Sequence, residues 1–349
     1  MNKGAVINVN RDGRVIANFV VTQAISGGGK SQAVKARSSD DRDVFMKRFL
    51  SPIYPRESTD DDRKFAKRLE GCLRFEERHR EIMDRLAKPI VYGGNLVKPI
   101  HFFREKFNYY KVYPFVDSES SRAMVGEDPQ DQELFAKTFL ASLRELHARD
   151  IVHADLKPDN VLVQRRPAGP VAKLIDFDEA FLSGQPPQRL VGGDPVYYSP
   201  EMATYLAQYT GAESRATSVD PGQLTTSSDM FAVGLVLHEV IAGHPAEVSG
   251  GAGESHAEIV AHGGTVEMKP LAGFPREFNN ALQQVVVLDP ADRPTVDELL
   301  GTLGVRAEPA RRTPTPRESV SIIGSVEIKS SMGTRRNRNA ARTRTEPGR

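Results

Sequence analysis

The chain has 349 residues, 39% of them hydrophobic and 27% charged, and its net charge at pH 7 is +1. This length is sufficient for one large domain or two lobes with sizeable cores. The near-neutral charge excludes a global electrostatic attraction to nucleic acid or to a membrane, and we expect neither as a partner. The single cysteine, Cys72, excludes an internal disulfide and is typical of a reducing, cytoplasmic compartment.

Residues 15–25 form an apolar stretch rich in β-branched side chains, which predicts a strand. Asn18 and Gln23 interrupt the stretch and no cleavage-type sequence follows it, so it does not predict a signal peptide. No apolar run in the sequence approaches the length of a membrane span. We therefore expect a soluble intracellular protein.

A glycine-rich segment follows this strand. Glycine lets the backbone approach phosphates closely, and free amides there can hold anionic oxygens. The sequence Gly29-Lys30-Ser31 matches the end of a Walker phosphate loop, but the first glycine of that loop would fall at Ala24. A flexible hairpin tip explains the segment equally well, so a phosphate-binding role is left open here for Gly27, Gly28 and Gly29.

The next segments predict a strand, a long helix, another strand and a second helix. Residues 44–49 alternate like a strand and contain Lys47, and residues 60–86 carry apolar side chains at helical spacing among charges. Residues 109–117 predict a strand that runs into an extended connection. Asp128 before Pro129 predicts the start of the second helix.

Residues 151–163 contain a dense set of polar groups between two short apolar ends: His153, Asp155, Lys157 and Asn160. The carboxylate can accept a proton, the ammonium can stabilise phosphate charge, and the amide oxygen can bind Mg²⁺. A solvated turn explains any three of these residues but not the complete pattern.

Further motifs follow this stretch. A predicted strand at 171–175 ends in Asp176-Phe177-Asp178, residues 193–201 end in Pro200-Glu201, and residues 289–295 contain Arg293-Pro294-Thr295. Residues 227–237 predict an apolar helix with a capping start. The glycine, serine, threonine and proline residues between Glu201 and Asp229 predict an inserted loop.

In order and spacing, these motifs resemble those of the eukaryotic-like Ser/Thr protein kinase family. The pattern His-x-Asp-Leu-x-x-x-x-Asn resembles the catalytic loop, and Asp-Phe-Asp resembles the metal-binding Asp-Phe-Gly. The resemblance extends over about residues 15–304 and implies a buried ion pair between Glu201 and Arg293. It implies an α+β, bilobal protein kinase-like fold with a small β-rich N-lobe, one key helix in that lobe, and a larger, mainly helical C-lobe.

The resemblance implies an ATP site in the N-lobe. Its residues would come from the glycine-rich loop and its flanks, the strand lysine, a helix glutamate and the hinge: Ile25, Gly27, Gly28, Gly29, Val34, Lys47, Glu81, Pro114, Phe115 and Val116. The helix glutamate would face inward and hold Lys47. The candidates are Glu70, Glu76, Glu77 and Glu81, and we choose Glu81 because its surroundings best match the family's helix end and following strand. Tyr113 would be the gatekeeper before the hinge.

The resemblance also implies the roles of the catalytic groups. Asp155 would accept the proton of the substrate hydroxyl, and Lys157 would contact the transferred phosphate. Asn160 and Asp176 would bind Mg²⁺, or Mn²⁺ in its place. Lys157, two residues after the base, resembles the Ser/Thr-directed version of the loop.

A set of positions departs from the family pattern: Phe45 for a small residue against adenine, Ala154 for the arginine before the base, Asp178 for glycine and Asp194 for threonine. The chain thus resembles a non-RD variant of the family, with His-Ala-Asp and Asp-Phe-Asp motifs. We expect Asp178 to restrict the backbone and favour one position of Asp176. Asp194 can pair with Lys157 but repels Asp155, and we therefore expect an unusual substrate selectivity.

The resulting predictions are an N-lobe at 1–114, a C-lobe at 115–304, and a disordered Arg-rich tail at 305–349 that is a candidate docking segment for a partner. The predicted activity is ATP- and Mg²⁺-dependent phosphoryl transfer to Ser or Thr of a protein substrate. One alternative is a weak or silent pseudokinase scaffold, which the departures from the family pattern suggest. The other is a small-molecule phosphotransferase of related fold, which would not be expected to carry Glu201 and Arg293.

Overall fold

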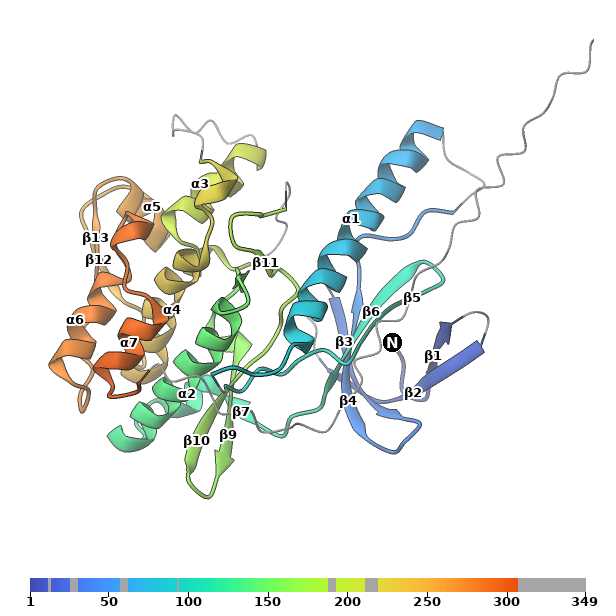
Figure 1. Cartoon of the computed structure of the whole chain (residues 1–349), viewed down its shortest axis with the longest axis horizontal. Coiled ribbons are helices and arrows are strands. Elements are labelled where there is room, and N and C mark those ends of the chain that lie inside the picture. Colours follow the sequence, from blue (N-terminus) through green and yellow to red (C-terminus); the bar gives the residue numbers. More distant parts are fainter. Residues whose placement is uncertain are drawn as a thin grey trace, which may run out of the picture.

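The computed structural model describes residues 1–11, 14–25, 31–56, 62–92, 94–187, 193–210 and 219–306. It consists of an N-terminal β-sheet with one long helix and a mainly helical C-terminal region (Figure 1). The predicted α+β kinase-like architecture is therefore confirmed. The predictions for Gly27, Gly28, Gly29 and the Arg-rich tail lie outside the described residues.

The N-terminal sheet has six antiparallel strands in the order β1-β2-β3-β4-β6-β5. The strands are β1 (Val6–Arg11), β2 (Arg14–Ile25), β3 (Ser31–Ser38), β4 (Asp43–Phe49), β5 (His101–Glu105) and β6 (Asn108–Pro114). Strands β2, β4 and β6 were predicted from the sequence, whereas β1 was not. It extends the sheet by pairing with the first half of β2, where Val6 faces Val20.

Helix α1 (Asp62–Ala87) packs on one face of this sheet. Its buried residues Cys72 and Met83 contact Phe49, Phe102 and Tyr109 of the strands. The opposite face has its own buried cluster, which contains Ile7, Val9, Phe19, Val21, Val34, Ala36, Val44, Met46, Phe103, Tyr110 and Val112. The two faces are thus separately packed, and α1 lies on the face that carries Lys47.

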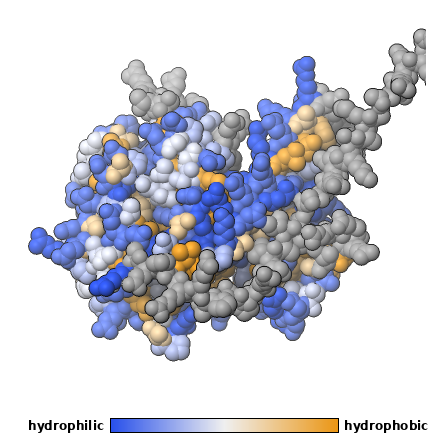
Figure 2. Space-filling view, viewed as in Figure 1, coloured by the Kyte–Doolittle hydropathy of each residue, from blue (hydrophilic) through white to orange (hydrophobic). Residues whose placement is uncertain are grey.

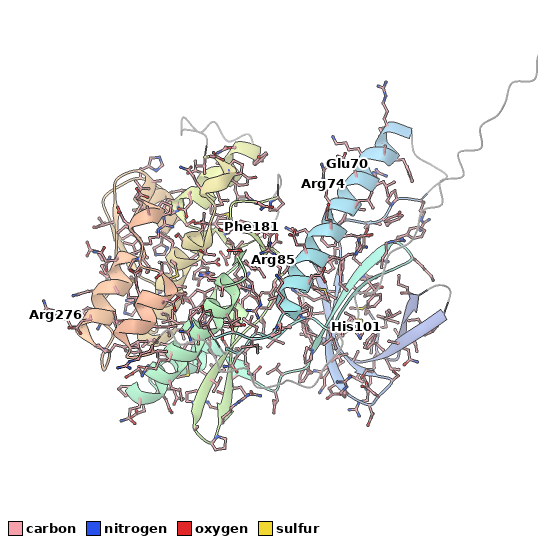
Figure 3. All side chains as sticks on the ribbon, in the orientation of Figure 1. Glu70, Arg74, Arg85, His101, Phe181 and Arg276 are labelled. Carbon is pink, nitrogen blue, oxygen red and sulfur yellow. The ribbon has the colours of Figure 1, made fainter. Side chains whose placement is uncertain are left out.

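The C-terminal end of α1 is fixed to the C-lobe. Arg149 donates to the backbone oxygens of Arg85 at 3.0 Å, Lys88 at 3.1 Å and Pro89 at 2.9 Å. Figure 3 shows Arg85 at the end of α1 that lies against the C-lobe, with Glu70 and Arg74 further toward the other end. A buried arginine that satisfies several carbonyls restricts how far this end of the helix can move.

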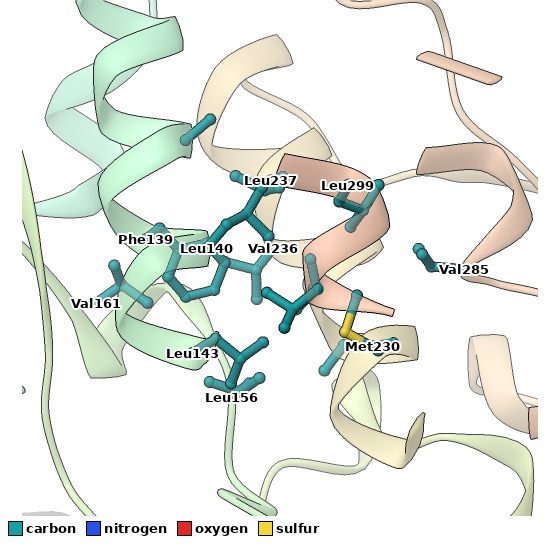
Figure 4. Close-up of a cluster of buried hydrophobic side chains, with 14 of the residues drawn as sticks. Phe139, Leu140, Leu143, Leu156, Val161, Met230, Val236, Leu237, Val285 and Leu299 are labelled. Atoms are coloured by element: carbon teal, nitrogen blue, oxygen red, sulfur yellow. The ribbon is translucent and has the colours of Figure 1, made fainter. Parts of the chain in front are cut away.

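The C-lobe is built from helices around an apolar core. Its helices are α2 (Pro129–His147), α3 (Pro200–Thr210), α4 (Thr226–Ala242), α5 (His256–Ala261), α6 (Arg276–Gln284) and α7 (Val296–Thr302). Apolar side chains of α2 and α4 meet in this core (Figure 4), among them Phe139, Leu140, Leu143, Met230, Val236 and Leu237. Helix α4 can be apolar on almost all sides because it is buried on almost all sides.

Short strands and 3₁₀ helices connect these helices. The strands are β7 (Glu119–Ser120), β8 (Ile151–Val152), β9 (Val161–Arg166), β10 (Gly169–Leu174), β11 (Phe181–Leu182), β12 (Glu247–Ser249) and β13 (Thr265–Glu267). The 3₁₀ helices are η1 (Ser121–Met124), η2 (Pro158–Asn160), η3 (Pro195–Tyr197), η4 (Pro221–Gln223) and η5 (Pro290–Asp292).

The helix starts test the capping predictions. Asp128 Oδ1 accepts from the amide of Gln130 at 2.8 Å with Pro129 at the first position, as predicted. Helix α4 is capped by Thr225, two residues earlier than the predicted start. Helix α3 occupies Pro200–Thr210, so the inserted loop expected between Glu201 and Asp229 does not begin directly after Glu201, and residues 211–218 of that stretch lie outside the described residues.

The ion pair expected between Glu201 and Arg293 is present and buried. The guanidinium of Arg293 donates to Oε1 and Oε2 of Glu201, each at 2.8 Å. It also donates to the carbonyls of Ser227, Val287 and Leu288. The pair therefore joins the start of α3 to the start of α4 and to the segment before η5.

The visible face of the molecule is mostly hydrophilic, with hydrophobic residues in small separate patches (Figure 2). None of the helices in the described segments is long and apolar enough to cross a membrane.

Candidate active site

The catalytic-loop residues lie between β8 and β9 and are held by Asp229 of α4. The amides of His153 and Ala154 donate to Oδ2 and Oδ1 of Asp229 at 2.8 and 3.0 Å. Ala154 has a φ of 62°, a left-handed conformation that is rare for residues other than glycine. A strained residue beside the predicted base persists because the buried carboxylate of Asp229 fixes both amides.

Asp155 has a defined set of partners. Lys157 Nζ lies 3.1 Å from each of its carboxylate oxygens. The Nδ2 of Asn160 donates to Asp155 Oδ2 at 2.9 Å and to its backbone oxygen at 2.6 Å. The structure therefore brings the predicted base, the predicted phosphate-binding lysine and one predicted metal ligand together. Both bonds are made by the amide nitrogen of Asn160, so they do not involve its side-chain oxygen.

Asp176 follows β10 and lies close to the catalytic loop. The amide of Ile175 donates to the backbone oxygen of Asn160 at 3.1 Å, and His153 Nε2 donates to the backbone oxygen of Ile175 at 2.9 Å. Asp176 has a φ of 65°. Its Oδ2 accepts from Lys47 at 2.6 Å, whereas its Oδ1 is buried and has no hydrogen-bond partner among the described residues. A buried carboxylate oxygen without a partner costs free energy unless a cation binds it.

Lys47 lies on β4 between two carboxylates. Its Nζ is 2.6 Å from Asp176 Oδ2 and 2.9 Å from Asp178 Oδ2. Burial by itself would lower the pKa of Lys47, but the charges of Asp178 and Asp176 outweigh it and raise the pKa above its ordinary value. Burial and the neighbouring Asp178 raise the pKa of Asp176. Lys47 is therefore charged at neutral pH and able to contact phosphate.

A second lysine, Lys111 of β6, was not predicted as part of the site. Its side chain is 0% exposed, and its Nζ lies 2.8 Å from Asp178 Oδ1 and 3.0 Å from His79 Nδ1. The hydroxyl of Tyr113, the expected gatekeeper, donates to the same Asp178 oxygen at 3.2 Å. Burial would raise the pKa of Asp178, but Lys111 and Lys47 lower it well below its usual range. Asp178 is thus an ionised carboxylate at the centre of the site.

The expected pair between Glu81 and Lys47 is wrong. The side chain of Glu81 is 48% exposed and lies 4.0 Å from Arg85, on the surface of α1. Of the other candidates, Glu70 pairs with Arg74 at the surface, and Glu76 accepts from the hydroxyl of Tyr109 at 2.8 Å. The helical pattern gives the period of α1 but not the rotation that decides which glutamate faces inward.

Strand pairing decides which residues share the sheet face of Lys47. Residues directly opposite each other on antiparallel strands share a face, and successive residues alternate. Lys47 faces Ala33, and Ala33 faces Ile25, so Ile25 lies on the expected side. Val34 faces Met46 and is buried in the cluster on the other side of the sheet. Val34 therefore does not share the face of Lys47, contrary to its expected place in the ATP site, and Ala33 is the neighbouring residue that does.

The predicted hinge begins at Pro114, the last residue of β6. The amide of Phe115 donates to the backbone oxygen of Asp43 at 3.3 Å, and Pro114 has no N–H group. Lys35 Nζ lies 4.1 Å from the centre of the Phe115 ring, and Phe115 is exposed together with Pro114. Of the predicted hinge residues, Val116 is then the one whose amide donates to no backbone group of the described chain.

Asp194 lies opposite the catalytic loop and does not use its ability to pair with Lys157. Its Oδ1 accepts from the amide of Val196 at 3.1 Å and caps η3, while Lys157 pairs with Asp155. A small cavity beside Asp155 is lined by Asp194 and Tyr198, together with residues of the catalytic loop, α3 and α4.

Two signals in the sequence could have identified Lys111 and Asp178 as partners. Lys111 interrupts the otherwise apolar run from Tyr109 to Tyr113, and a lysine in a buried strand requires a carboxylate. Asp178 is a carboxylate at a position where the family has glycine. The distance between them in the sequence conceals the pair.

Comparison with known proteins shows the family of this chain. Residues 23–303 match the protein kinase domain family, and the chain therefore belongs to that family. It is 27% identical over 186 residues to a calcium and calcium/calmodulin-dependent serine/threonine-protein kinase of Pisum sativum, covering 53% of this chain and 32% of the relative. It is 26% identical over 251 residues to the serine/threonine-protein kinase RAD53 of Saccharomyces cerevisiae, covering 66% and 28%. A calcium/calmodulin-dependent serine/threonine-protein kinase of Malus domestica is 23% identical over 351 residues, covering 90% and 79%. The chain spans about a third of the length of the first two relatives.

Proposed function

We propose that this protein transfers the γ-phosphoryl group of ATP to serine or threonine hydroxyls of protein substrates. The observation that carries the proposal is the meeting of two groups of side chains at one site. Asp155, Lys157 and Asn160 form one group, and Lys47 with Asp176 forms the other. Phosphoryl transfer depends mainly on positioning and on stabilisation of charge, and these groups supply both.

Asp155 is the proposed general base. Its carboxylate is held by Lys157 and Asn160, so it can accept the proton of a hydroxyl that enters beside it. Asp194 and Tyr198 line a small cavity next to Asp155 on the C-lobe side. Lys157, two residues after the base, favours a serine or threonine hydroxyl.

Asn160 and Asp176 fit a divalent cation, Mg²⁺ or Mn²⁺. The oxygen donors are an amide and a carboxylate whose buried Oδ1 has no partner within the described chain. One carboxylate with phosphate oxygens is a usual environment for Mg²⁺ in such enzymes. When bound, the cation would neutralise charge on the nucleotide phosphates.

Lys47 is the proposed phosphate-binding lysine of the N-lobe, which we assign to residues 1–114. Ile25 and Ala33 support a base-binding surface on the same face of the sheet, and the amide of Val116 is the proposed hinge donor to adenine. The C-lobe at 115–304 would then carry the base and the substrate side.

A catalytically silent scaffold is the second candidate function. Phe45 packs at 6.3 Å, centroid to centroid, from the ring of Tyr113, at the place where the family has a small residue against adenine. Both aromatic rings lie in the N-lobe wall of the proposed nucleotide site. Nucleotide binding therefore separates the two candidate functions.

We expect Asp176→Asn to abolish the additional thermal stabilisation that Mg²⁺ gives in the presence of ATP, because the substitution removes the charged metal ligand. Thermal-shift titrations with ATP, with and without Mg²⁺, measure this. Asp159→Asn is the matched control, since the side chain of Asp159 is 69% exposed and pairs with Arg122. A wild-type protein without any shift with ATP and either Mg²⁺ or Mn²⁺ would favour the scaffold.

We also expect activity to be independent of phosphorylation in the segment after Asp178. Ser183 carries the one hydroxyl in residues 179–193. The residue before the base is Ala154, which packs in an apolar cluster with Val152, Phe181, Met202, Tyr205 and Leu224. An alanine there cannot form the charge-assisted bonds by which an arginine receives a phosphate.

The measurement compares kinase activity of wild type and Ser183→Ala, each before and after phosphatase treatment. We expect the four preparations to be equally active. A large loss of activity in the Ser183→Ala variant or after phosphatase would reveal a phosphate switch at this segment.

A further inference from the structure

The carboxylate of Asp178 joins two ammonium groups in the interior of the site. Its Oδ2 lies 2.9 Å from Lys47 Nζ and its Oδ1 lies 2.8 Å from Lys111 Nζ. The side chains of Lys47, Lys111 and Asp178 are 14%, 0% and 13% exposed. Charges at this depth require compensation by an opposite charge, and Asp178 compensates both lysines.

Helix α1 faces this cluster without a carboxylate. Arg78 donates to the backbone oxygen of Asp178 at 3.0 Å, and His79 Nδ1 lies 3.0 Å from Lys111 Nζ. Because an ammonium can only donate, the ring of His79 must accept at Nδ1 and be neutral. Burial and the charge of Lys111 lower the pKa of His79 well below its usual range, which agrees with this state. Of the α1 glutamates that were candidates for Lys47, Glu70, Glu77 and Glu81 are exposed, and Glu76 accepts from the hydroxyl of Tyr109.

We propose that Asp178 is the positioning residue for Lys47 and does the work that a helix glutamate would otherwise do. The proposal rests on the proposed function, in which Lys47 contacts the phosphates of ATP. Lys47 has two carboxylate partners, and Asp176 is assigned to the divalent cation. Asp178 is then the carboxylate that keeps Lys47 in place when nucleotide and cation are bound.

In this arrangement one short segment, residues 176–178, contains both the proposed metal ligand, Asp176, and the residue that positions Lys47, Asp178. The other carboxylate oxygen of Asp178 is fixed by Lys111 and Tyr113 of β6, which are part of the sheet. The backbone at Asp178 does not have a positive φ, so a residue with a side chain is accommodated there. The position of Lys47 is thereby set by strands and by this segment rather than by a glutamate of α1.

A double-mutant cycle on ATP affinity tests the proposal. The variants are Lys47→Met, Asp178→Asn and the combination, and the affinity for ATP with Mg²⁺ is measured by calorimetry. We expect each single substitution to weaken binding roughly tenfold or more, as loss of a charge-assisted bond does. We expect the combination to bind no more weakly than Lys47→Met alone, because Asp178 acts through Lys47. Fully additive losses would overturn the proposal.

Asp178→Asn also leaves Lys111 buried without a carboxylate, so this variant is at risk of unfolding. Lys111→Met combined with Asp178→Asn removes both charges. We expect this double variant to be thermally more stable than Asp178→Asn alone and to bind ATP as weakly as Asp178→Asn does. If the double variant bound ATP with wild-type affinity, the role of Asp178 would be only to neutralise Lys111, and the proposal would be overturned.

Glu81→Gln is the matched control, because it removes an exposed carboxylate from α1. We expect Glu81→Gln to bind ATP like the wild type. A tenfold weaker affinity would indicate that Glu81 of α1 positions Lys47. The cycle measures ATP binding and not phosphoryl transfer, so its result can be told apart from a failure of the proposed function. A wild-type protein that binds ATP and transfers no phosphate would contradict the proposed function, and the cycle would still decide the role of Asp178.

Discussion

Asp155→Asn is expected to lower the rate of phosphoryl transfer by about 10²–10⁴-fold, the usual contribution of a general base. Asparagine has almost the same shape as aspartate and can still accept from Lys157, but it cannot take up the hydroxyl proton. Initial rates with saturating ATP and Mg²⁺ measure the loss. ATP affinity should change little, because Asp155 pairs with Lys157 and Asn160 rather than with Lys47.

Circular dichroism and a thermal-shift titration with ATP and Mg²⁺ would show whether the Asp155→Asn variant is folded and binds nucleotide. Asp159→Asn serves as the control, since it makes the same substitution at an exposed position of the same loop. A folded Asp155→Asn protein with the wild-type rate would remove Asp155 from the mechanism.

Arg293→Met is expected to lower the free energy of unfolding by about 3–5 kcal/mol, because it leaves the carboxylate of Glu201 buried without its partner. The guanidinium has no exposed surface, and it also donates to the carbonyls of Ser227, Val287 and Leu288. Methionine fills part of the volume but replaces none of these bonds. Urea denaturation followed by circular dichroism measures the change.

Lys269→Met is the control for this prediction. Lys269 pairs with Glu247 at 2.6 Å, but the two side chains are 65% and 60% exposed, so little or no change in stability is expected. A loss below about 1 kcal/mol in Arg293→Met, within the range of ordinary surface substitutions, would contradict the structural role of the buried pair.

The sequence predicts the fold and the catalytic loop well because their signals are local. The apolar run of α4, the Asp128 cap of α2 and the compact motif around Asp155 each depend on neighbouring residues. The pair of Glu201 with Arg293 could be predicted although it is distant in sequence, because each partner lies in a motif of its own.

The charge arrangement around Lys47 could not be read from the sequence in the same way. The strand containing Val34 is evident, but a shift of one residue exchanges the two faces of a strand. The helix containing Glu81 is evident as well, but its rotation depends on packing against Phe49 and Phe102. Asp178 was recognised as a departure from the family pattern, and its meaning became visible only with the position of Lys111.

The most direct test of the proposed activity is to identify the phosphorylated product. The wild-type protein would be incubated with γ-labelled ATP, Mg²⁺ and generic protein substrates, with the Asp155→Asn variant in parallel, and the labelled amino acids would be separated after hydrolysis. The proposed mechanism predicts labelled phosphoserine or phosphothreonine with the wild type and almost none with the variant. Label that remains in ATP, or that appears in a small molecule and not in protein, would contradict it.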